Sequence, residues 1–522
     1  MAHITFLDET MRDGQQSLWG MRMQAGMALP VTPIIDRTGY NIISLAGSSL
    51  FEVLTRHCQE DPWAGLDLLI GSMPNTPLRA GCRSNGSVTF GFTPDVLMDL
   101  WVDRLCAHGI RSFWLYDVLF NIDKMHRLAK IAKGHGCQVA GTMLFTLSPV
   151  HDDAYYADKA DKLSALPEVD SLLLYDTGGV LDRDRISTLV PAIVAKSRGK
   201  PIEMHANNML GQSAKTYMDA IEFGVTVLHT AVRPMANGPS IPSIEIMTKN
   251  VEMMGHTHNI DTSKLPPVAD HFERVGKAAG FLVNQFFEYD VTALKHQIPG
   301  GMMGTLRAQL VQQNMLDKLP AVLAEVALVR RELGYPGMAT PFAQLVGTLA
   351  VLNIVTGKRY SVVPDEVIQY AAGYYGDPVA PIDAHVMDQI MAKPRAKEIL
   401  ANPPEQPDLA ELRRRHGTGE DDDELILRAL VPASDIEKMR KAGPVARDYP
   451  TLSSPELAQV QKLVKMANAP LVQIRPSAPA FTLRRKFSSH PPPSGASPLP
   501  SLSRREREGA RPAQPGGKGE GE

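Results

Sequence analysis

Cysteine is scarce in this chain of 522 residues, and its four cysteines, Cys58, Cys82, Cys106 and Cys137, are not spaced in pairs. A structural zinc site needs closely spaced ligand pairs, and a disulfide-rich secreted domain needs a denser set of cysteines. The sequence therefore excludes both as the basis of the fold. Scattered cysteines are typical of reduced, mostly buried thiols, so we expect a cytoplasmic protein.

Long hydrophobic runs and an excess of charge of one sign are also missing. The N-terminal stretch MAHITFLDET reaches acidic residues after a short apolar segment, and no other run is long enough to span a bilayer. The formal net charge is −3, without the concentrated basic patch that binds nucleic acid. We therefore expect no secretion, no membrane insertion and no nucleic-acid partner, which leaves a small-molecule enzyme as the favoured class.

What the chain does contain is a regular alternation of strand-like and helix-like segments in its first 290 residues. Repeated strand-helix units are typical of a parallel sheet that is covered by helices. We therefore predict an α/β fold whose first domain, residues 1–290, is a (β/α)8 TIM barrel. The eight segments predicted to be strands are residues 4–8, 41–47, 79–85, 112–117, 138–145, 171–176, 201–207 and 225–232.

The pattern changes after residue 290. Residues 291–468 are predicted to form a mostly helical second domain, because strand-like segments stop there. From 469 to 522, proline, serine, glycine, arginine and glutamate accumulate, with too little apolar surface to offset the entropy of ordering the chain, so we expect a disordered tail. The stretches of the second domain that read as helices are 304–333, 341–355, 364–373 and 384–401.

Polar residues follow the first predicted strand, in the stretch LDETMRDGQQS. Because the carboxyl ends of barrel strands form the active-site face, Asp8, Arg12, Asp13 and Gln16 are expected at the mouth of the barrel. Carboxylate, guanidinium and amide groups together could hold a metal ion and an anionic substrate. The competing interpretation is a loop of caps and ion pairs around a barrel entrance.

The sixth, seventh and eighth predicted strands add further candidates. Tyr175 stands at the end of the strand SLLLYD, directly before a glycine pair. His205 and Asn207 are two residues apart, so a regular strand projects both to the same side, where nitrogen and oxygen could reach one ion. His229 is another candidate ligand, although its orientation depends on the strand register. For each histidine the alternative is a packed, hydrogen-bonded side chain.

The stretch DETMRDGQQSLWGMRM, residues 8–23, resembles the DxTxRDxxQS opening of the biotin-dependent carboxyltransferase subunits of the pyruvate carboxylase, oxaloacetate decarboxylase and transcarboxylase group. The resemblance extends over roughly residues 1–445 in the family's order. The further motifs are EDPW (60–63), SPVH (148–151), HANNMLG (205–211), RPMANGPSIPS (233–243), KHQIPGGM (295–302), ELGYP (332–336), TPFAQLVGTLAVLNIVTGKRY (340–360) and YYGDPVAPID (374–383).

The resemblance implies a metal site in which two ligands have changed. The family binds a divalent metal through an aspartate on strand one, a carbamylated lysine on strand six and two histidines on strand seven. Asp8 and His205 are taken as the matching residues, whereas Tyr175 replaces the lysine and Asn207 the second histidine. A phenol is a weak ligand, and an amide oxygen favours harder ions than zinc. The expectation is therefore Zn, Mn or Mg at Asp8, His205 and Asn207, or no metal.

Other positions of the family concern substrate, biotin and proton transfer. Arg12 and Gln16 match positions associated with substrate and biotin, and Arg83 matches a substrate-binding arginine. The family's proton-shuttling threonine is Pro239 here, which has neither a hydroxyl nor a backbone N–H. The neighbouring Ser240 is the remaining candidate for that role.

The resemblance implies transfer of CO2 between carboxybiotin and the enolisable carbon of a small oxo acid such as pyruvate or oxaloacetate. Arg12 and Arg83 would bind the carboxylate, and Tyr175 is a candidate proton donor. No AMKM-like biotinyl turn is found in the chain. We therefore expect carboxybiotin on a separate biotin carboxyl carrier protein, a biotin carboxylase subunit as second partner, and a homodimer.

Two alternatives remain at the level of the sequence. One is a lyase of the wider metal-dependent barrel superfamily, whose opening motif is similar; the motifs between residues 295 and 383 favour the biotin enzymes instead. The other is a non-catalytic subunit that scaffolds an active carboxylase, which the replaced lysine, histidine and threonine would permit.

Overall fold

The structure, a computed structural model, describes residues 1–47, 49–85, 92–299, 302–303, 306, 310–311 and 314–451, and the backbone of 471–474 and 481–484. Residues 1–451 form one compact unit, and residues 452–522 are assigned to a second unit. Of the helices in the described part of the chain, none has the length and apolar character needed to cross a membrane.

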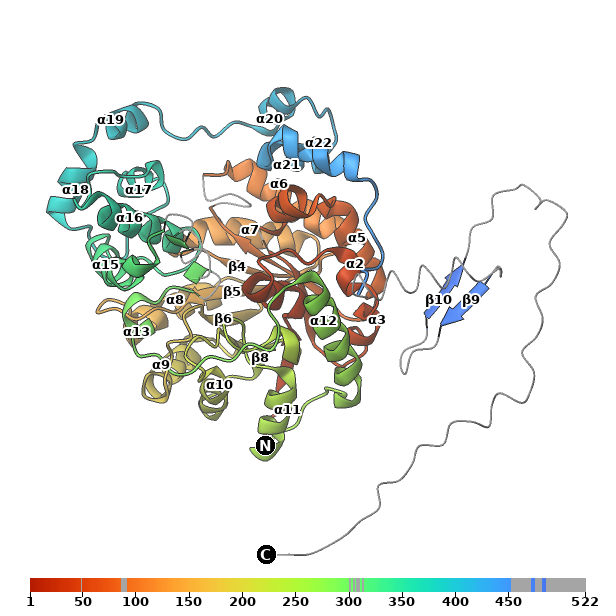
Figure 1. The fold of residues 1–522 in the computed structure, drawn as a ribbon. Coiled ribbons are helices and arrows are strands. Elements are labelled where there is room, and N and C mark those ends of the chain that lie inside the picture. Colours follow the sequence, from red (N-terminus) through yellow and green to blue (C-terminus); the bar gives the residue numbers. More distant parts are fainter. Residues whose placement is uncertain are drawn as a thin grey trace, which may run out of the picture. The chain divides into compact units, whose positions relative to one another are not determined.

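Eight parallel strands close into a barrel in sequence order, with β1 pairing to both β2 and β8 (Figure 1). The predicted barrel and all eight predicted strands are thereby confirmed. The strands are β1 Thr5–Asp8, β2 Ile42–Ala46, β3 Leu78–Arg83, β4 Ser112–Tyr116, β5 Gln138–Leu144, β6 Ser171–Asp176, β7 Ile202–Ala206 and β8 Val227–Thr230.

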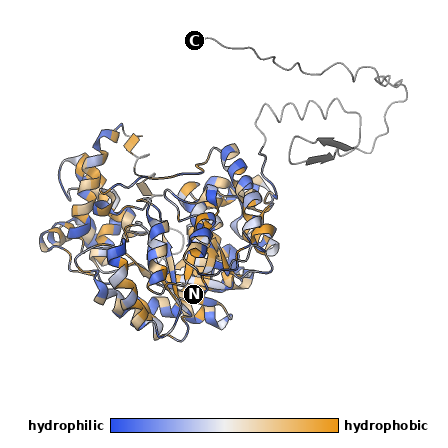
Figure 2. Cartoon of the chain, turned by 90° about the horizontal axis from the view of Figure 1, so that it is seen from below, coloured by the Kyte–Doolittle hydropathy of each residue, from blue (hydrophilic) through white to orange (hydrophobic). Residues whose placement is uncertain are grey.

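The two faces of each strand have different surroundings. In β1, Phe6 joins the large hydrophobic core between strands and helices, whereas Leu7 packs with Ile42 and Val227 in a small separate cluster on adjacent strands. Because side chains alternate along a strand, Leu7 marks the face that points into the barrel. Hydropathy colouring shows hydrophobic residues along the central strands and on the surrounding helices (Figure 2).

Helices surround the barrel, and several begin at a capping residue. The side chains of Asp61, Asn121, Asp152 and Asp182 accept backbone N–H groups at the starts of α5, α7, α8 and α9. Each cap fixes where the chain turns from a strand into the next helix. The helices of this part are α1 Gln15–Leu18, α2 Ala25–Ala28, α3 Thr32–Ile35, α4 Leu50–Val53, α5 Pro62–Ser72, α6 Asp95–His108, α7 Ile122–Gly134, α8 Asp153–Ser164, α9 Arg183–Lys196, α10 Ser213–Glu222, α11 Ile244–Met253 and α12 Leu265–Ala279.

The predicted helical region follows the barrel and packs on one side of it. One hydrophobic cluster joins Trp114, Leu144 and Tyr175 of the barrel strands to Val326 and Phe342 of this region. These strand residues and the helices therefore belong to one hydrophobic cluster. They are α13 Ala293–His296, α15 Leu319–Glu332, α16 Phe342–Thr356, α17 Asp365–Ala371, α18 Ala384–Met391 and α19 Pro394–Ala401.

One predicted helix of this region is two helices, and another is described only in part. The stretch 384–401, predicted as one helix, is two helices that separate before Pro394. Proline has no backbone N–H to continue the preceding helix, so it stands at the first position of α19. The stretch 304–333 is confirmed over Leu319–Glu332, while much of its first half lies outside the described residues.

The last three helices return to the barrel. They are α20 Leu409–His416, α21 Asp422–Leu430 and α22 Ala433–Ala442, drawn beside α5 and α6 (Figure 1). Leu425 and Ile426 join the barrel's own core, and the indole Nε1 of Trp63 donates to the Asp423 carbonyl at 3.2 Å. The helices of the predicted second domain thus divide between two cores, and the boundary predicted at residue 290 stays a prediction.

Most of the expected disordered tail, 469–522, lies outside the described residues. The two described segments, Leu471–Ile474 and Phe481–Arg484, are strands β9 and β10, which pair antiparallel. The sequence analysis did not predict this strand pair.

Candidate functional site

The turn after β1 carries the charged residues of the barrel mouth. A short π-helical turn, Thr10–Gly14, follows the strand and is entirely buried. The Thr10 hydroxyl donates to Asp8 Oδ1 at 2.6 Å and accepts the backbone N–H of Val232 at 2.9 Å. Thr10 therefore ties the turn to the loop after β8, and Arg12 and Asp13 are held in place on it.

A cleft made of two adjoining cavities opens at this end of the barrel. The inner cavity has a volume of about 90 Å³ and the outer one about 330 Å³. Gln16, Tyr116 and Tyr175 line both cavities, and so do Thr340 and Gln344 of the helical region. Barrel and helical region therefore build the cleft together.

The structure brings four of the predicted site residues to one place. Arg12, Gln16, Arg83 and Tyr175 all line the inner cavity. They come from β3, β6 and the two short helical turns after β1, which are separated by up to 163 positions in the sequence. The prediction that these residues share a site agrees with their positions, while their chemical roles stay predictions.

The floor of the inner cavity depends on one glycine. Gly81 of β3 lies against the indole ring of Trp114, so closely that a Cβ atom there would come within 2.3 Å of the ring. The ring in turn lies under the Arg12 guanidinium, 5.2 Å from its carbon. A larger cavity of about 490 Å³ lies elsewhere, along α11 and α12, and none of the predicted site residues lines it.

Asp8 is not part of this cleft, and its expected partnership with His205 is wrong. Its neighbours are the Thr10 hydroxyl, the buried Tyr40 and the half-buried Glu245. The physical reason is strand alternation: Leu7 faces the barrel interior, so Asp8 faces the surrounding helices. Burial raises the pKa of Asp8 to about 7.

Asp13 takes the place that the sequence analysis gave to Asp8. Its Oδ1 lies 3.5 Å from His205 Nε2, and the Asn207 amide nitrogen lies 3.3 Å from both of its oxygens. Ser240 donates its hydroxyl hydrogen to Asp13 Oδ2 at 3.0 Å. The carboxylate that contacts His205 and Asn207 thus comes from the turn after β1, five residues beyond Asp8.

These residues do not fit the divalent metal that the family resemblance implies. The Asn207 amide nitrogen donates to the Pro239 carbonyl at 2.9 Å and faces the Asp13 carboxylate, so this end of Asn207 offers donors, not a ligand oxygen. Burial raises the pKa of Tyr175, which keeps it a neutral phenol and a weak ligand. The donor set is therefore arranged for hydrogen bonds within the protein.

Ser240 lies behind Asp13 and lines neither cavity among the described residues. Its backbone carbonyl accepts the N–H of Asn208, and its own N–H donates to the Asn237 carbonyl. The turn is thus not reshaped to bring the hydroxyl into the cleft. This position suits a residue that orients Asp13 better than the proton relay suggested by the sequence.

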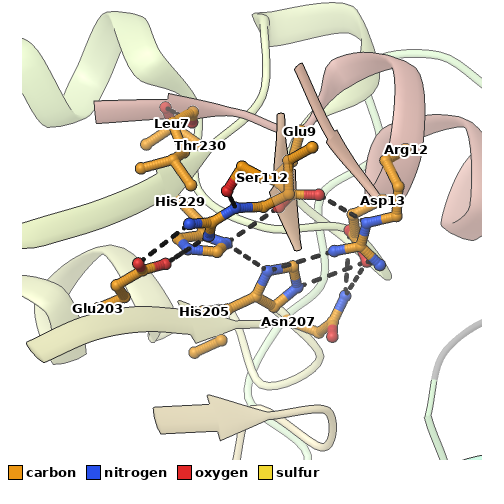
Figure 3. Close-up of polar contacts among 12 residues, drawn as sticks. Leu7, Glu9, Arg12, Asp13, Ser112, Glu203, His205, Asn207, His229 and Thr230 are labelled. Carbon is orange, nitrogen blue, oxygen red and sulfur yellow. Dashed lines mark hydrogen bonds and ion pairs between the residues drawn. The ribbon is translucent and has the colours of Figure 1, made fainter. Parts of the chain in front are cut away.

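Below the cleft, charged side chains of alternating sign follow one another through the barrel interior (Figure 3). Arg12 Nε donates to Glu9 Oε2 at 2.6 Å, and Glu9 Oε1 lies 3.0 Å from His229 Nδ1. His229 Nε2 lies 2.9 Å from Glu203 Oε2, and Arg79 bonds both Glu203 oxygens at 2.5 and 3.1 Å. We call Arg12, Glu9, His229, Glu203 and Arg79 the interior charge chain.

Burial and neighbouring charges shift the pKa values of several residues in the interior charge chain. Burial alone raises the pKa of Glu9, but the Arg12 charge and the contact with His229 outweigh it and hold the pKa below its usual range. For His229, burial acts to lower the pKa, yet Glu203 and Glu9 raise it overall. His205, by contrast, has a pKa lowered by burial. Both ring nitrogens of His229 face carboxylate oxygens, at 3.0 and 2.9 Å, and this geometry suits the imidazolium, which donates from both nitrogens.

The sequence analysis considered His229 only as a ligand and missed Glu9, Arg79 and Glu203. Glu203 and His205 are two apart in β7, the same signal that singled out Asn207, and it could have found Glu203. No comparable signal exists for Arg79, whose partner is 124 residues away in the sequence.

Comparison with known proteins finds one matching family and several related carboxylase subunits. A family described as a conserved carboxylase domain matches residues 293–468. A pyruvate carboxylase subunit of Methanocaldococcus jannaschii is 31% identical over 455 residues, which are 85% of this chain and 80% of that protein. The 2-oxoglutarate carboxylase large subunit of Hydrogenobacter thermophilus is 30% identical over 84% of this chain and 69% of its own length.

A solved structure shows the same fold. The carboxyl transferase domain of Rhizobium etli pyruvate carboxylase, determined with oxamate and biotin, aligns with a TM-score of 0.77 at 20% sequence identity. The alignment covers 86% of this chain and 79% of that one. The likeness thus includes both the barrel and the helical region.

Proposed function

Because the chain belongs to the biotin-dependent carboxyltransferase family and is a carboxyltransferase subunit of a biotin-dependent carboxylase, we propose that it moves CO2 between carboxybiotin and a small 2-oxo acid. Relatives named for pyruvate and for 2-oxoglutarate suggest the substrate class. The observation that carries the proposal is the convergence of Arg12, Gln16, Arg83 and Tyr175 on the inner cavity.

In the proposed reaction, Arg83 and Arg12 bind the substrate carboxylate in the inner cavity. Guanidinium groups match a carboxylate by paired N–H donors, and both side chains are buried. Gln16, which lines both cavities, holds the ureido ring of biotin where the two cavities meet. The outer cavity is the route by which the carrier's biotin reaches that point.

Tyr175 is proposed to pass the proton. When the methyl carbon of the oxo acid gives up its proton, the Tyr175 oxygen accepts it and hands its own hydroxyl proton to the ureido nitrogen that has released CO2. The new carbon–carbon bond then forms between the enolate carbon and CO2. Burial raises the pKa of Tyr175, so the hydroxyl is protonated at neutral pH and has a proton to give.

We propose the partners that this reaction requires: a separate biotin carboxyl carrier protein and a biotin carboxylase subunit that charges it. We also propose a homodimer, on the resemblance alone. The second candidate, a non-catalytic scaffold, is favoured by one observation, that Tyr175 and Asn207 do not offer the family's metal ligands.

The test is decarboxylation of oxaloacetate, and of oxalosuccinate, by the purified full chain with and without free biotin, since this half-reaction needs neither carrier nor ATP. We expect turnover that free biotin stimulates. A Tyr175→Phe variant should lose about a hundredfold in rate and a Val194→Ala variant on the exposed face of α9 should lose none. Absence of turnover with both substrates, beside an active family enzyme, would support the scaffold.

A further inference from the structure

The interior charge chain and Asp13 together are balanced in charge without a metal ion. Arg12, His229 and Arg79 carry positive charge, while Glu9 and Glu203 carry negative charge between them. Asp13, whose Oδ1 lies 3.6 Å from Arg12 Nη1, adds the last negative charge. Every charge is at least nine-tenths buried, and each has an opposite charge beside it, which is the condition for keeping ions in a barrel interior.

The same region contains the one cluster of described residues whose geometry could hold an ion: Glu9, His205 and His229 offer ligand atoms within 4.8 Å of one another. Two atoms there lack an aligned hydrogen bond, Glu9 Oε1 and His205 Nε2. They face different neighbours, however. Glu9 Oε1 lies 3.0 Å from His229 Nδ1, and His205 Nε2 lies 3.5 Å from Asp13 Oδ1, so each of the two atoms already faces a polar group of the protein.

Charge also favours a proton over a divalent ion in this cluster. An ion bound by Glu9 and His229 would displace the proton of His229 and leave one positive charge in excess. The Arg12 guanidinium already lies beside this cluster: its Nε is 2.6 Å from Glu9 Oε2 and its Nη2 is 3.4 Å from His205 Nδ1. A second cation would meet the guanidinium at close range in a buried site, where such repulsion is poorly screened.

The Arg12 guanidinium is the charged end of this chain that meets the inner cavity. Its strong bond, Nε to Glu9, faces the interior, whereas Nη1 and Nη2 make long contacts to Asp13 and His205, and Tyr175 is a further hydrogen-bond partner of the guanidinium. Since Nη1 and Nη2 together carry four N–H groups, the guanidinium can still donate to a ligand. In a 2-oxo acid the oxo oxygen and a carboxylate oxygen are adjacent, so one guanidinium can hold both.

We propose that the interior charge chain replaces the divalent metal of the family, with Arg12 as the fixed cation that stabilises the enolate oxygen. Glu9, His229, Glu203 and Arg79 are positioning residues that hold Arg12 and keep its charge balanced. The enolate oxygen gains hydrogen bonds from Arg12 as the carbon–hydrogen bond breaks, and no additional electrophile is needed. The reaction in this inference rests on the proposed function. The claim that no metal is needed rests on the contacts within the interior charge chain.

The first experiment measures metal binding and does not depend on activity. The purified full chain is dialysed against Zn²⁺ or Mn²⁺, and bound metal per chain is measured by mass spectrometry. We expect wild type to retain far less than one ion per chain. The double variant Tyr175→Lys with Asn207→His, which restores the family's ligand types beside Asp13 and His205, is the comparison in which binding should rise. One ion per wild-type chain would overturn the proposal.

The second experiment tests the charge balance. Glu203→Gln alone leaves Arg79 unpaired and should lower the rate of biotin-stimulated decarboxylation about tenfold or more. Glu203→Gln combined with Arg79→Met removes both charges and should recover most of that loss, which a purely structural defect would not do. His126→Gln on the outer face of α7 is the matched control without effect. A double variant as impaired as the single one would overturn the balance argument.

The two experiments separate the inference from the proposed function. A wild-type chain that neither binds metal nor turns over any tested oxo acid would sink the carboxyltransferase reaction for this chain and with it the role of Arg12. A chain that turns over and loses activity to a chelator would overturn the inference alone. Metal-free turnover that a chelator leaves unchanged is the expected result.

Discussion

At the scale of single residues, two aspartates five positions apart have opposite environments. Asp13 shares its carboxylate with Ser240, Asn207 and His205, whereas Asp8 is buried on the helix side of β1 with one oxygen unpartnered. The difference follows from the direction of each side chain and not from residue type. The two positions therefore have separable effects on activity and on stability.

Asp13→Asn should lower biotin-stimulated decarboxylation by about a hundredfold, because an amide cannot accept from both Ser240 and Asn207 while facing His205. Asp8→Asn should retain wild-type rates, since Asp8 does not line the cleft. Steady-state kinetics of the two variants side by side checks this. Equal losses in both would contradict the assignment of Asp13 to the site.

Asp8 should make stability depend on pH. Burial raises its folded pKa to about 7, above the unfolded value of about 4. The group therefore contributes stability below pH 4, and this contribution is lost as pH rises toward 7 and above, by about 4 kcal/mol as an upper figure. Calorimetric Tm values of wild type should fall between pH 5 and pH 8 more than those of Asp8→Asn. Parallel curves would contradict the shifted pKa.

At the scale of elements, contact between neighbouring strands shapes the cleft. Gly81 on β3 leaves room for the Trp114 ring on β4, and the two strands pair at these positions. The ring supports Arg12 from below. A side chain at position 81 would therefore displace the Trp114 ring and so change the shape of the inner cavity.

Gly81→Ala should destabilise the fold by about 1–3 kcal/mol and raise KM for the oxo acid, because the added Cβ pushes the indole ring toward Arg12. Gly71→Ala, in α5 with nothing near the added carbon, should leave both quantities almost unchanged. Denaturant unfolding and initial rates of the two variants provide the comparison. A stable Gly81→Ala protein with normal KM would show that the ring does not support the site.

At the scale of the whole molecule, the barrel and the helical region belong to one compact unit, residues 1–451, and one of its hydrophobic clusters joins them. Trp114, Leu144 and Tyr175 are covered by helices that follow residue 291. A barrel cut off from those helices would expose this apolar surface. Residue 290 is where the strand-like pattern of the sequence stops. We expect cooperative folding to need the residues on both sides of it.

Two truncations test this dependence. A chain of residues 1–451 should melt at the same temperature as the full chain, because the compact unit remains whole. A chain of residues 1–290 should be insoluble or lack a cooperative transition. Thermal unfolding followed by circular dichroism distinguishes them. A cooperatively folding 1–290 fragment would show that the barrel is an independent domain.

The sequence predicted the eight strands because each is a short apolar run between turn signals. It predicted Arg12, Gln16 and Tyr175 from their places at strand ends, and Arg83 through the family resemblance. It assigned Asp8 to the site instead of Asp13, because the face of a strand to which Asp8 points depends on a register that the sequence does not show. The pairing of Arg79 with Glu203 could not be predicted from the sequence, because it depends on two strands that face each other across the barrel.

Thr340 and Gln344 stand at the start of α16 and line both cavities, although they belong to no barrel strand. The barrel holds the buried charges, which tolerate little change, while this helix start supplies part of the wall. Substitutions there can alter which ligand fits without disturbing the charge chain. Buried charges and cavity wall thus come from different parts of the fold, and we expect a change of substrate to need substitutions in one turn of one helix only.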